Sequence, residues 1–335
     1  MKQAGSLFLM FLIAVGTAFL ILLLIGEQPS TLIQAFRYTF FTRFGLGYSF
    51  YYTTPLIFTG LAVAVCFHAG LFNIGAEGQL LWGSIAVVCL SHFFPDLPRG
   101  FALFSGILAA GLAGSLWAFI PAYFKSYRGI HEVVTTLLLN LIATAWVNYL
   151  ILYTFKNPES QAAETELITI GYRLPQTLFA TTPANSSFFL AVLLTVFLQW
   201  VLFKTTFGFE IRALGENARA AELSGITRSK RLLQAFLLSG FLSGLVGVNE
   251  VMGGEYKVIE GFSPGYGFTG IAVALLARNQ PLVILFTSFL LGSLQNFSRE
   301  LEFFGDVISK EVAWVLQALL IFAVGTRKWW EKKWN

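Results

Sequence analysis

The sequence is poor in charged residues and in the side chains that most enzymes use. Only 12% of its 335 residues are charged, whereas soluble domains carry about a quarter. Its three histidines are scattered, and its two cysteines, Cys66 and Cys89, lack CxxC spacing. No GxxxxGK segment followed by Ser or Thr occurs, so the chain lacks that phosphate-cradling loop. We therefore expect no catalytic residues, no metal site, no cofactor and two buried free thiols.

Apolar residues make up 56% of the chain, which is more than a soluble protein can keep away from water. A membrane-spanning helix takes about 20 apolar residues. We predict ten spans, two of them unusually short, at 5–25, 55–70, 79–95, 101–124, 133–155, 187–204, 232–252, 266–277, 281–297 and 311–326. The fold class expected is an all-α polytopic membrane protein, with one integral-membrane domain over 1–335. The net charge of only +4 gives no reason to expect a nucleic-acid partner.

The distribution of Lys and Arg predicts the orientation of these helices. With the N-terminus inside, the cytoplasmic segments hold 14 of the 22 basic residues, as the positive-inside rule requires. Both termini are therefore expected in the cytoplasm. The tail at 327–335 mixes Trp with Lys and Arg, which is typical of an anchor to membrane lipid at the interface.

Two glycine-rich segments interrupt the apolar runs, at 70–79 and 261–270. Because each half has five spans, the second half (about 187–326) should run inverted relative to the first (about 1–160). Interrupted helices at matching places of inverted halves indicate a transport site. The residues expected along the translocation route are Phe72, Asn73, Glu77, Gln79, Tyr266, Phe268 and Thr269.

Glu77 is the only carboxylate in the stretch 56–95. A charge inside the membrane is costly and suggests a function, so one role is direct contact with the solute. The role we expect is structural, since a carboxylate near a helix N-terminus is stabilised by the helix dipole. We expect Asn73 and Gln79 to bond backbone groups freed by the break. Polar side chains elsewhere are expected to bond between helices: Asn140, Asn249 and Glu250.

Small residues line two of the predicted spans. They are Gly106, Ala109, Ala110, Gly111, Ala113 and Gly114 in one, and Gly240, Gly244 and Gly247 in the other. In lipid, helix backbones approach closely where side chains are small. We expect packing within the chain, with a subunit interface as the alternative.

The longest cytoplasmic loop, 205–231, contains a predicted helix of about two turns. Asn217 fits its N-cap and Gly225 its C′ position. Ala218 and Ala221, three residues apart, share a face that would fit a groove on another protein. A solvated connector is the alternative. The coupling residues expected here are Glu216, Asn217, Ala218, Arg219, Ala220, Ala221, Glu222 and Gly225, and Arg219 is expected to pair with Glu222.

Four stretches together resemble one family of transport proteins. They are GLFNIGAEGQL at 70–80, HEVVTTLLLN at 131–140, GFEIRALGENARAAELSGI at 208–226 and GFTGIAVALLARNQPL at 267–282. They are similar to the permease subunit of ABC importers for nucleosides and simple sugars, within the superfamily of branched-chain amino-acid permeases. The resemblance covers about residues 60–326, and HEVVTTLLLN fits the longer permease of such systems.

The resemblance implies the fold, the partners and the location. It implies about ten helices, a bacterial inner-membrane location, a cytoplasmic ABC ATPase, an extracytoplasmic solute-binding protein and a second permease. That second subunit is expected to be a shorter paralogue, though a homodimer stays open. The loop at 205–231 would contact the ATPase through Glu216–Gly225. Among substrates, nucleoside, simple sugar and riboflavin all remain open.

Two other classes of function compete with an importer subunit. A stand-alone secondary transporter or facilitator needs a buried ion or proton site, for which Glu77 is the only candidate, and it leaves the 205–231 loop unexplained. A membrane enzyme needs clustered catalytic groups at one interface, and the sequence offers none. The sequence therefore favours the translocation subunit of an ATP-driven importer.

Overall fold

The structure is a computed structural model that describes residues 28–305, except 177, 178 and 180, together with the single residues 16, 26 and 318. Its α-helices are α2 (Pro29–Phe41), α3 (Arg43–His68), α4 (Ala76–Phe93), α5 (Arg99–Arg128), α6 (Glu132–Tyr149), α7 (Ser187–Lys204), α8 (Thr206–Glu216), α9 (Ala218–Leu223), α10 (Arg228–Gly244), α11 (Tyr266–Leu276) and α12 (Pro281–Phe304). Two π-helical turns, η1 (Leu150–Thr154) and η3 (Val248–Gly254), extend α6 and α10, and η2 (Ile170–Tyr172) is a 3-10 turn. The predicted spans 5–25 and 311–326 and the tail at 327–335 lie outside the described residues.

Every predicted span within the described residues corresponds to a helix, but not all of these helices are long and apolar enough to cross a membrane. Six helices there are long and apolar enough to cross a membrane: Arg43–His68, Arg99–Arg128, Glu132–Thr154, Ser187–Lys204, Arg228–Gly254 and Pro281–Phe304. α4 falls short because Glu77, Gln79 and His92 lower its mean hydropathy, and α11 is too short. The predicted ten spans in two inverted halves therefore stay a prediction.

The N-terminal part of the described chain holds more helix than the sequence predicts. α2 is unpredicted, and α3 begins at Arg43 rather than at residue 55. The segment 43–54 is rich in Tyr, Thr and Ser, which lowers its hydropathy without preventing a helix. Buried side chains such as Leu32 and Ala35 show that tertiary packing supports this region.

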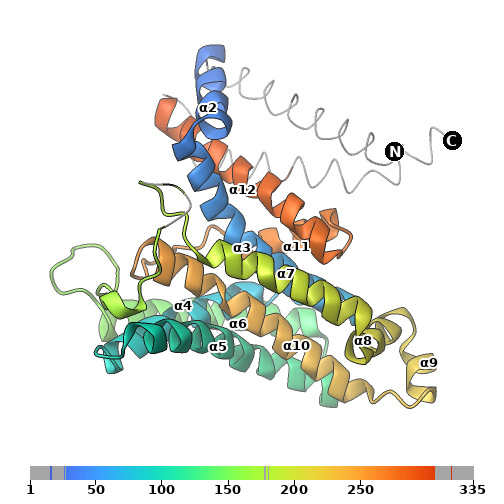
Figure 1. Ribbon diagram of the computed structural model, residues 1–335. Coiled ribbons are helices and arrows are strands. Elements are labelled where there is room, and N and C mark those ends of the chain that lie inside the picture. Colours follow the sequence, from blue (N-terminus) through green and yellow to red (C-terminus); the bar gives the residue numbers. More distant parts are fainter. Residues whose placement is uncertain are drawn as a thin grey trace. The chain divides into compact units, whose positions relative to one another are not determined.

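The chain divides into two compact units. The larger unit comprises residues 54–288, and the smaller unit comprises 1–53 and 289–335. This boundary does not fall between the predicted halves, because α3 and α12 each contribute to both units. The inner packing of the larger unit is built on α10, which lies along α5 and α4 (Figure 1).

Glycines hold α10 tightly against its two neighbours. A Cβ on Gly114 would lie 2.3 Å from the carbonyl oxygen of Gly240, and one on Gly244 would lie 2.2 Å from that of Ala110. The order of these contacts makes α5 and α10 antiparallel. On the α4 side, a Cβ on Gly83 would lie 2.3 Å from the carbonyl oxygen of Gly244. The small residues therefore serve close helix packing within the chain, as expected.

The smaller unit packs α2, the start of α3 and the end of α12 together. Leu32, Ala35 and Leu301 form an apolar cluster. The side-chain amide of Asn296 donates to the carbonyl of Gly45, 2.7 Å away, and so joins α12 to α3. A polar bond of this kind between helices compensates for the lack of hydrophobic driving force in lipid.

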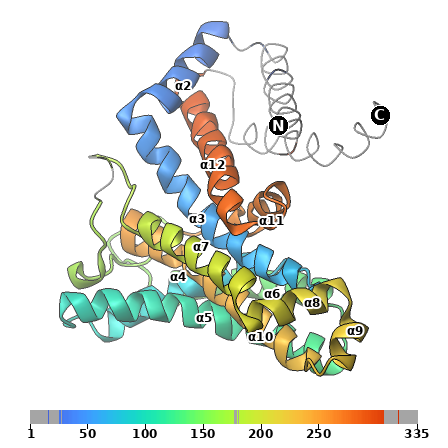
Figure 2. The ribbon, with the colours of Figure 1, turned by 45° about the vertical axis from the view of Figure 1, so that its right-hand side comes forward.

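The two ends of the larger unit differ in charge. One end carries α8, α9 and the start of α10 (Figure 2), and its exposed basic residues are Arg128, Lys204, Arg219, Arg228, Lys230 and Arg278. At the other end the segment 156–168 is tied to 256–260, for example by the Lys257–Glu164 ion pair at 2.6 Å. Exposed carboxylates there are Asp96, Glu159, Glu166, Glu255 and Glu260.

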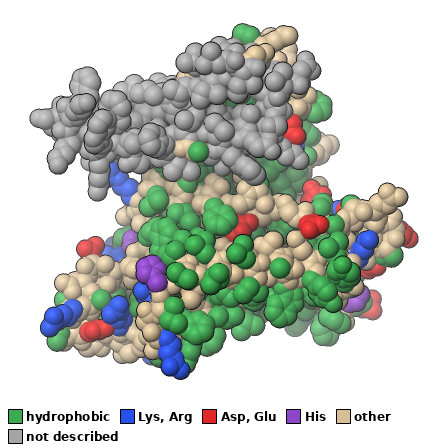
Figure 3. Space-filling view, turned by 180° about the vertical axis from the view of Figure 1, so that it is seen from behind, with side chains coloured by type: hydrophobic (Ala, Val, Ile, Leu, Met, Phe, Trp, Pro, Cys, Tyr) green, Lys and Arg blue, Asp and Glu red, His purple; other side chains and the backbone are tan. Residues whose placement is uncertain are grey.

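Between these ends, α5, α6 and α7 expose apolar side chains. Large exposed residues include Phe104, Leu116, Leu141, Trp146 and Leu193. In Figure 3 hydrophobic side chains cover much of the visible face of this unit, while charged side chains gather toward its ends. A continuous apolar surface of this kind suits contact with lipid or with another membrane subunit.

Candidate translocation site and coupling end

The broken segment between α3 and α4 is stabilised by its own polar side chains. Asn73 Oδ1 accepts from the backbone N–H of Gly75 at 2.9 Å, and Asn73 Nδ2 donates to Gln79 Oε1 at 3.0 Å and to Ser239 Oγ at 2.8 Å. Ser239 in turn donates to the carbonyl of Ala62 at 2.7 Å. Asn73 therefore bonds a backbone N–H of the broken segment, as expected. Gln79 instead bonds the side chain of Asn73.

Helix α6 holds the same segment from a second side. Asn140 Oδ1 accepts from the N–H of Gly78 at 2.9 Å, and its Nδ2 donates to the carbonyl of Ile74 at 2.9 Å. The buried carboxylate of Glu132 accepts from the N–H of Phe72 at 3.3 Å and pairs with Lys125 at 2.6 Å. Asn140 was expected to join helices. The role of Glu132 was missed, although it lies in the HEVVTTLLLN motif.

Glu77 joins the two broken segments. Its Oε2 accepts from the backbone N–H of Gly267, 2.7 Å away, in the first turn of α11. A Cβ on Gly267 would lie 2.3 Å from the backbone nitrogen of Glu77, so the starts of α4 and α11 touch. The sequence predicts both segments, and the tertiary structure brings them together across 190 positions.

The electrostatics of this contact favour a carboxylate. A helix N-terminus carries a partial positive charge from its unpaired N–H groups. Glu77 lies in the first turn of α4 and accepts a hydrogen bond from the first turn of α11. One carboxylate therefore lies at the positive N-terminal ends of both helices. Ser263 also stabilises the N-terminus of α11, because its Oγ accepts from the N–H groups of Gly265 and Tyr266 at 3.2 and 3.3 Å.

The remaining residues predicted for the route differ in exposure. Tyr266 is buried, with 1% of its surface exposed, and Thr269 is almost as enclosed. Phe72 is half-buried and Phe268 is 47% exposed. Phe72 lies in the irregular segment between α3 and α4, whereas Tyr266, Phe268 and Thr269 lie at the start of α11.

The predicted helix in the 205–231 loop exists, with the predicted caps. α9 begins after Asn217, whose Oδ1 accepts from the N–H of Ala220 at 3.1 Å. It ends at Leu223, and Gly225 follows at the C′ position, where its φ of +88° suits glycine. The N–H of Ile226 bonds the carbonyl of Ala221 and that of Gly225 bonds Glu222, which completes the C-terminal cap. The 11-residue helix α8, which precedes α9, was not predicted.

Two expectations about α9 are wrong. Ala221 is buried, with 5% of its surface exposed, so it packs against its own chain and not in a partner's groove. The reason is that α9 contacts both α8 and α10. Glu222 faces Arg228 at 3.8 Å, and no pair with Arg219 is formed in the described structure. The large apolar residue that α9 exposes is Leu223, at 84%.

Helix α8 connects this end to the rest of the larger unit. The Arg231 guanidinium bonds Glu210 and holds the pKa of that carboxyl below its ordinary value. Arg212 Nε donates to the carbonyl of Leu202 at 3.0 Å. A Cβ on Gly215 would lie 2.3 Å from the carbonyl oxygen of His68, so the end of α8 abuts the start of the broken segment.

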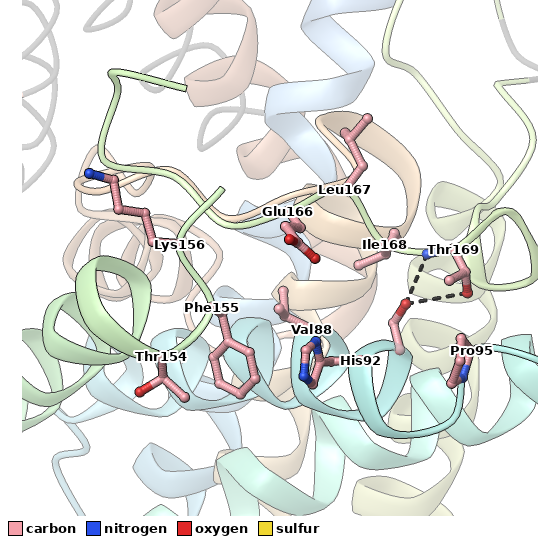
Figure 4. A pocket seen from close by; sticks show the side chains of 11 residues that line it. Val88, His92, Pro95, Thr154, Phe155, Lys156, Glu166, Leu167, Ile168 and Thr169 are labelled. Carbon is pink, nitrogen blue, oxygen red and sulfur yellow. Dashed lines mark hydrogen bonds between the residues drawn. The ribbon is translucent and has the colours of Figure 1, made fainter. Parts of the chain in front are cut away.

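A cavity of about 190 Å³ lies at the opposite end of this unit (Figure 4). His92 from α4 and Glu166 from the 156–168 segment point toward one another there, and the Phe155 ring lies beside His92, with the ring centroids 5.4 Å apart. Ser91 Oγ accepts from the N–H of Thr169 at 2.8 Å and closes one side. The described residues contain no group of three His, Cys, Asp or Glu side chains that could hold a metal ion.

Comparison with known proteins places this architecture in a family. Residues 45–325 match the family described as the branched-chain amino acid transport system, permease component. The chain belongs to this permease family.

Relatives of this permease are named for their solutes. A guanosine ABC transporter permease protein, NupP of Bacillus subtilis, is 34% identical over 82% of this chain and 79% of its own length. NupB of Lactococcus lactis, a nucleoside ABC transporter permease, is 33% identical over 82% and 77%. TsgB13 of Haloferax volcanii, a glucose ABC transporter permease, is 32% identical over 88% and 79%. The chain is thus an ABC transporter permease with apolar, membrane-type helices.

Proposed function

We propose that this permease carries nucleosides inward through the membrane as the translocation subunit of an ATP-driven importer. The observation that carries the proposal is the similarity to two permeases named for guanosine and nucleoside, at 33–34% identity over four fifths of the chain. The glucose permease is nearly as similar, so a simple sugar is the second candidate. All three named solute classes are neutral and carry hydroxyl groups.

ATP hydrolysis belongs in this proposal to a cytoplasmic partner that contacts α8 and α9. Support comes from the exposed side chains of α9, above all Leu223, and from the exposed basic residues around it. The contact of Gly215 with His68 would transmit a movement of this end to the broken segment between α3 and α4. The Glu77–Gly267 bond would then transmit the movement to α11.

The broken segments line the translocation route in this proposal, and Glu77 braces them. Irregular backbone within a membrane is tolerated where it is buried in protein or lines a water-filled cavity. The carboxylate of Glu77 is bound to a backbone N–H, which favours a bracing role over the ion site of a secondary transporter. The two halves would shift around this contact and expose the route alternately to each side.

Copurification and uptake test the proposal together. The tagged chain, expressed with its genomic neighbours, should copurify with an ABC ATPase, a second permease and an extracytoplasmic solute-binding protein. Cells carrying the complex should take up labelled guanosine, and unlabelled glucose in excess should not compete. Competition by glucose would favour the sugar candidate, and uptake by the chain alone would favour a stand-alone transporter.

A further inference from the structure

Another cavity, of about 510 Å³, lies at the end of the larger unit that carries α8. Its wall comes from the ends of α3 and α7, from α8 and from the turn after α11, and it includes His68, Phe203, Phe209, Arg212, Glu216 and Asn279. All of these residues belong to the larger unit. Because the membrane-type helices α3 and α7 both end here, the cavity lies at the level where lipid headgroups border the apolar layer.

Arg212 is held in the wall of this cavity without a carboxylate partner. Its Nε donates to the carbonyl of Leu202 at 3.0 Å, and its guanidinium lies over the ring of Phe203, 5.0 Å from the centroid. Among the described residues it belongs to no ion pair. The two contacts fix the orientation of the guanidinium and leave both terminal nitrogens able to donate. Such a group is preorganised to bind a phosphate through two parallel hydrogen bonds.

The other charges of this end do not neutralise Arg212. Glu210 is paired with Arg231, and Glu222 faces Arg228. Glu216 lines the same cavity, but it is exposed and forms no ion pair with Arg212 within the described structure.

Two further basic residues lie beside the cavity in the chain. Lys204 directly follows Phe203 and Arg278 directly precedes Asn279, and both are exposed. Three positive charges in and beside the cavity therefore stand against the single negative charge of Glu216. This balance favours an anionic ligand over a neutral or cationic one.

Exposed aromatic rings next to the cavity indicate which kind of anion fits. Phe209 lines the cavity and is 60% exposed. Trp200 is 55% exposed and lies one turn before Phe203 on the same helix. Trp side chains are typical of the boundary between membrane and water. An anion-binding arginine beside exposed rings, at the end of membrane-type helices, suits a molecule that carries a phosphate and apolar chains.

We propose that this cavity binds the headgroup of an anionic phospholipid. The lipid phosphate accepts from the terminal nitrogens of Arg212, and the acyl chains lie along Phe209 and Trp200. Basic pockets between membrane helices bind anionic headgroups in this way. Gly215 and His68, which join α8 to the broken segment, also line the cavity, so a bound lipid stabilises that contact. The inference goes beyond the proposed function, because it concerns the lipid and not the solute.

Lipid binding to the purified full chain tests the site. The chain in a neutral detergent would be titrated with dioleoylphosphatidylglycerol or dioleoylphosphatidylcholine, and bound lipid would be counted by native mass spectrometry. One phosphatidylglycerol should bind about fivefold or more tightly than phosphatidylcholine, since a basic residue attracts an anionic headgroup. Equal binding of the two lipids would overturn the proposal.

A pair of arginine variants separates the site from a general effect of charge. Arg212→Gln should lose most of the preference for phosphatidylglycerol. The matched control is Arg219→Gln, which removes the same charge from an exposed position of α9 outside the cavity and should keep the preference. Equal loss in both variants, or an unchanged preference in Arg212→Gln, would overturn the site.

A second pair fills the cavity without changing the charge. Ala213 lines the cavity, so Ala213→Trp should displace the lipid while circular dichroism shows the same helix content. Ala220→Trp, at an exposed position of α9, is the control and should bind lipid as the wild type does. Lipid binding retained in Ala213→Trp would contradict the proposal.

Two further measurements distinguish the lipid from other ligands. Inorganic phosphate in excess should not displace phosphatidylglycerol, and displacement would assign the cavity to a soluble phosphate compound instead. If Arg212→Gln kept its lipid preference but lost copurification with the ATPase, the cavity would belong to a protein partner. Lipid binding is measured without solute or ATP, so a failure of the proposed function would appear separately, as a wild-type complex that transports neither guanosine nor glucose.

Discussion

At the scale of single residues, Glu77 shows how a charge can be structural inside a membrane protein. Its oxygen accepts from Gly267 N–H at 2.7 Å. Glu77→Gln keeps a carbonyl acceptor, so we expect normal abundance and most of the uptake. Glu77→Leu leaves a buried N–H unpaired, which costs about 1–3 kcal/mol, so membrane abundance should fall. Immunoblots of membranes and uptake assays measure both effects.

The exposed carboxylate Glu166 supplies the control for that comparison. Glu166→Gln and Glu166→Leu should both leave abundance unchanged, since this side chain is exposed to solvent. If Glu77→Gln abolished uptake at normal abundance, the charge itself would matter, and the bracing role would be wrong.

At the scale of elements, α9 is the surface through which we expect a partner to act. Leu223→Arg places a charge on an 84% exposed side chain, so the fold should be unaffected. If Leu223 is a central contact, uptake should fall by about tenfold or more, which corresponds to roughly 1.4 kcal/mol of lost interaction. ATPase copurification should weaken in parallel, as measured by pull-down.

Two further variants of α9 separate docking from folding. Arg219→Ala should have little effect, because an exposed charge contributes little. Ala221→Trp should lower abundance, since Ala221 is buried in its own chain. Normal copurification and uptake with Leu223→Arg would show that α9 is a solvated connector.

The ion pair between α8 and α10 predicts a pH dependence. Arg231 lowers the pKa of Glu210 below its ordinary value of 4.5. The pair therefore stabilises the fold fully above that pH and loses its effect as the pH falls through the lowered pKa. Glu210→Gln should lower the melting temperature of the purified complex at pH 7, and the difference from wild type should shrink progressively as the pH falls below 4.5.

The neighbouring carboxylate provides the comparison for this pair. Glu216 is exposed and forms no ion pair within the described residues. Glu216→Gln should therefore leave the melting temperature unchanged across the same pH range. A difference between wild type and Glu210→Gln that persisted undiminished at low pH would contradict an electrostatic role of the pair.

At the scale of the whole molecule, the orientation in the membrane is the property to test. Exposed basic residues outnumber exposed carboxylates at the α8–α9 end of the larger unit, and exposed carboxylates outnumber exposed basic residues at the other. In a background lacking both native cysteines, Glu166→Cys should react with a membrane-impermeant maleimide added outside intact cells. Glu216→Cys should react only after the membrane is opened. The reverse pattern would invert the predicted orientation.

Local signals in the sequence determined the apolar helices and the two ends of α9. Apolar runs predicted every membrane-type helix of the described chain, and Asn217 and Gly225 predicted the caps of α9, because capping depends on residues a few positions apart. The helical segment 43–54 was not predicted, since a helix supported by tertiary packing needs no continuous apolar run.

Only the tertiary structure decided which groups meet. Glu77 and Gly267 are 190 positions apart, and nothing local links a carboxylate to one particular N–H in a distant helix. The burial of Ala221 depends on α8 and α10, and a face defined by spacing alone cannot tell its own chain from a partner. The cavity beside Arg212 likewise emerges only when α3, α7 and α8 are placed, because a cavity is the space that separate elements leave between them.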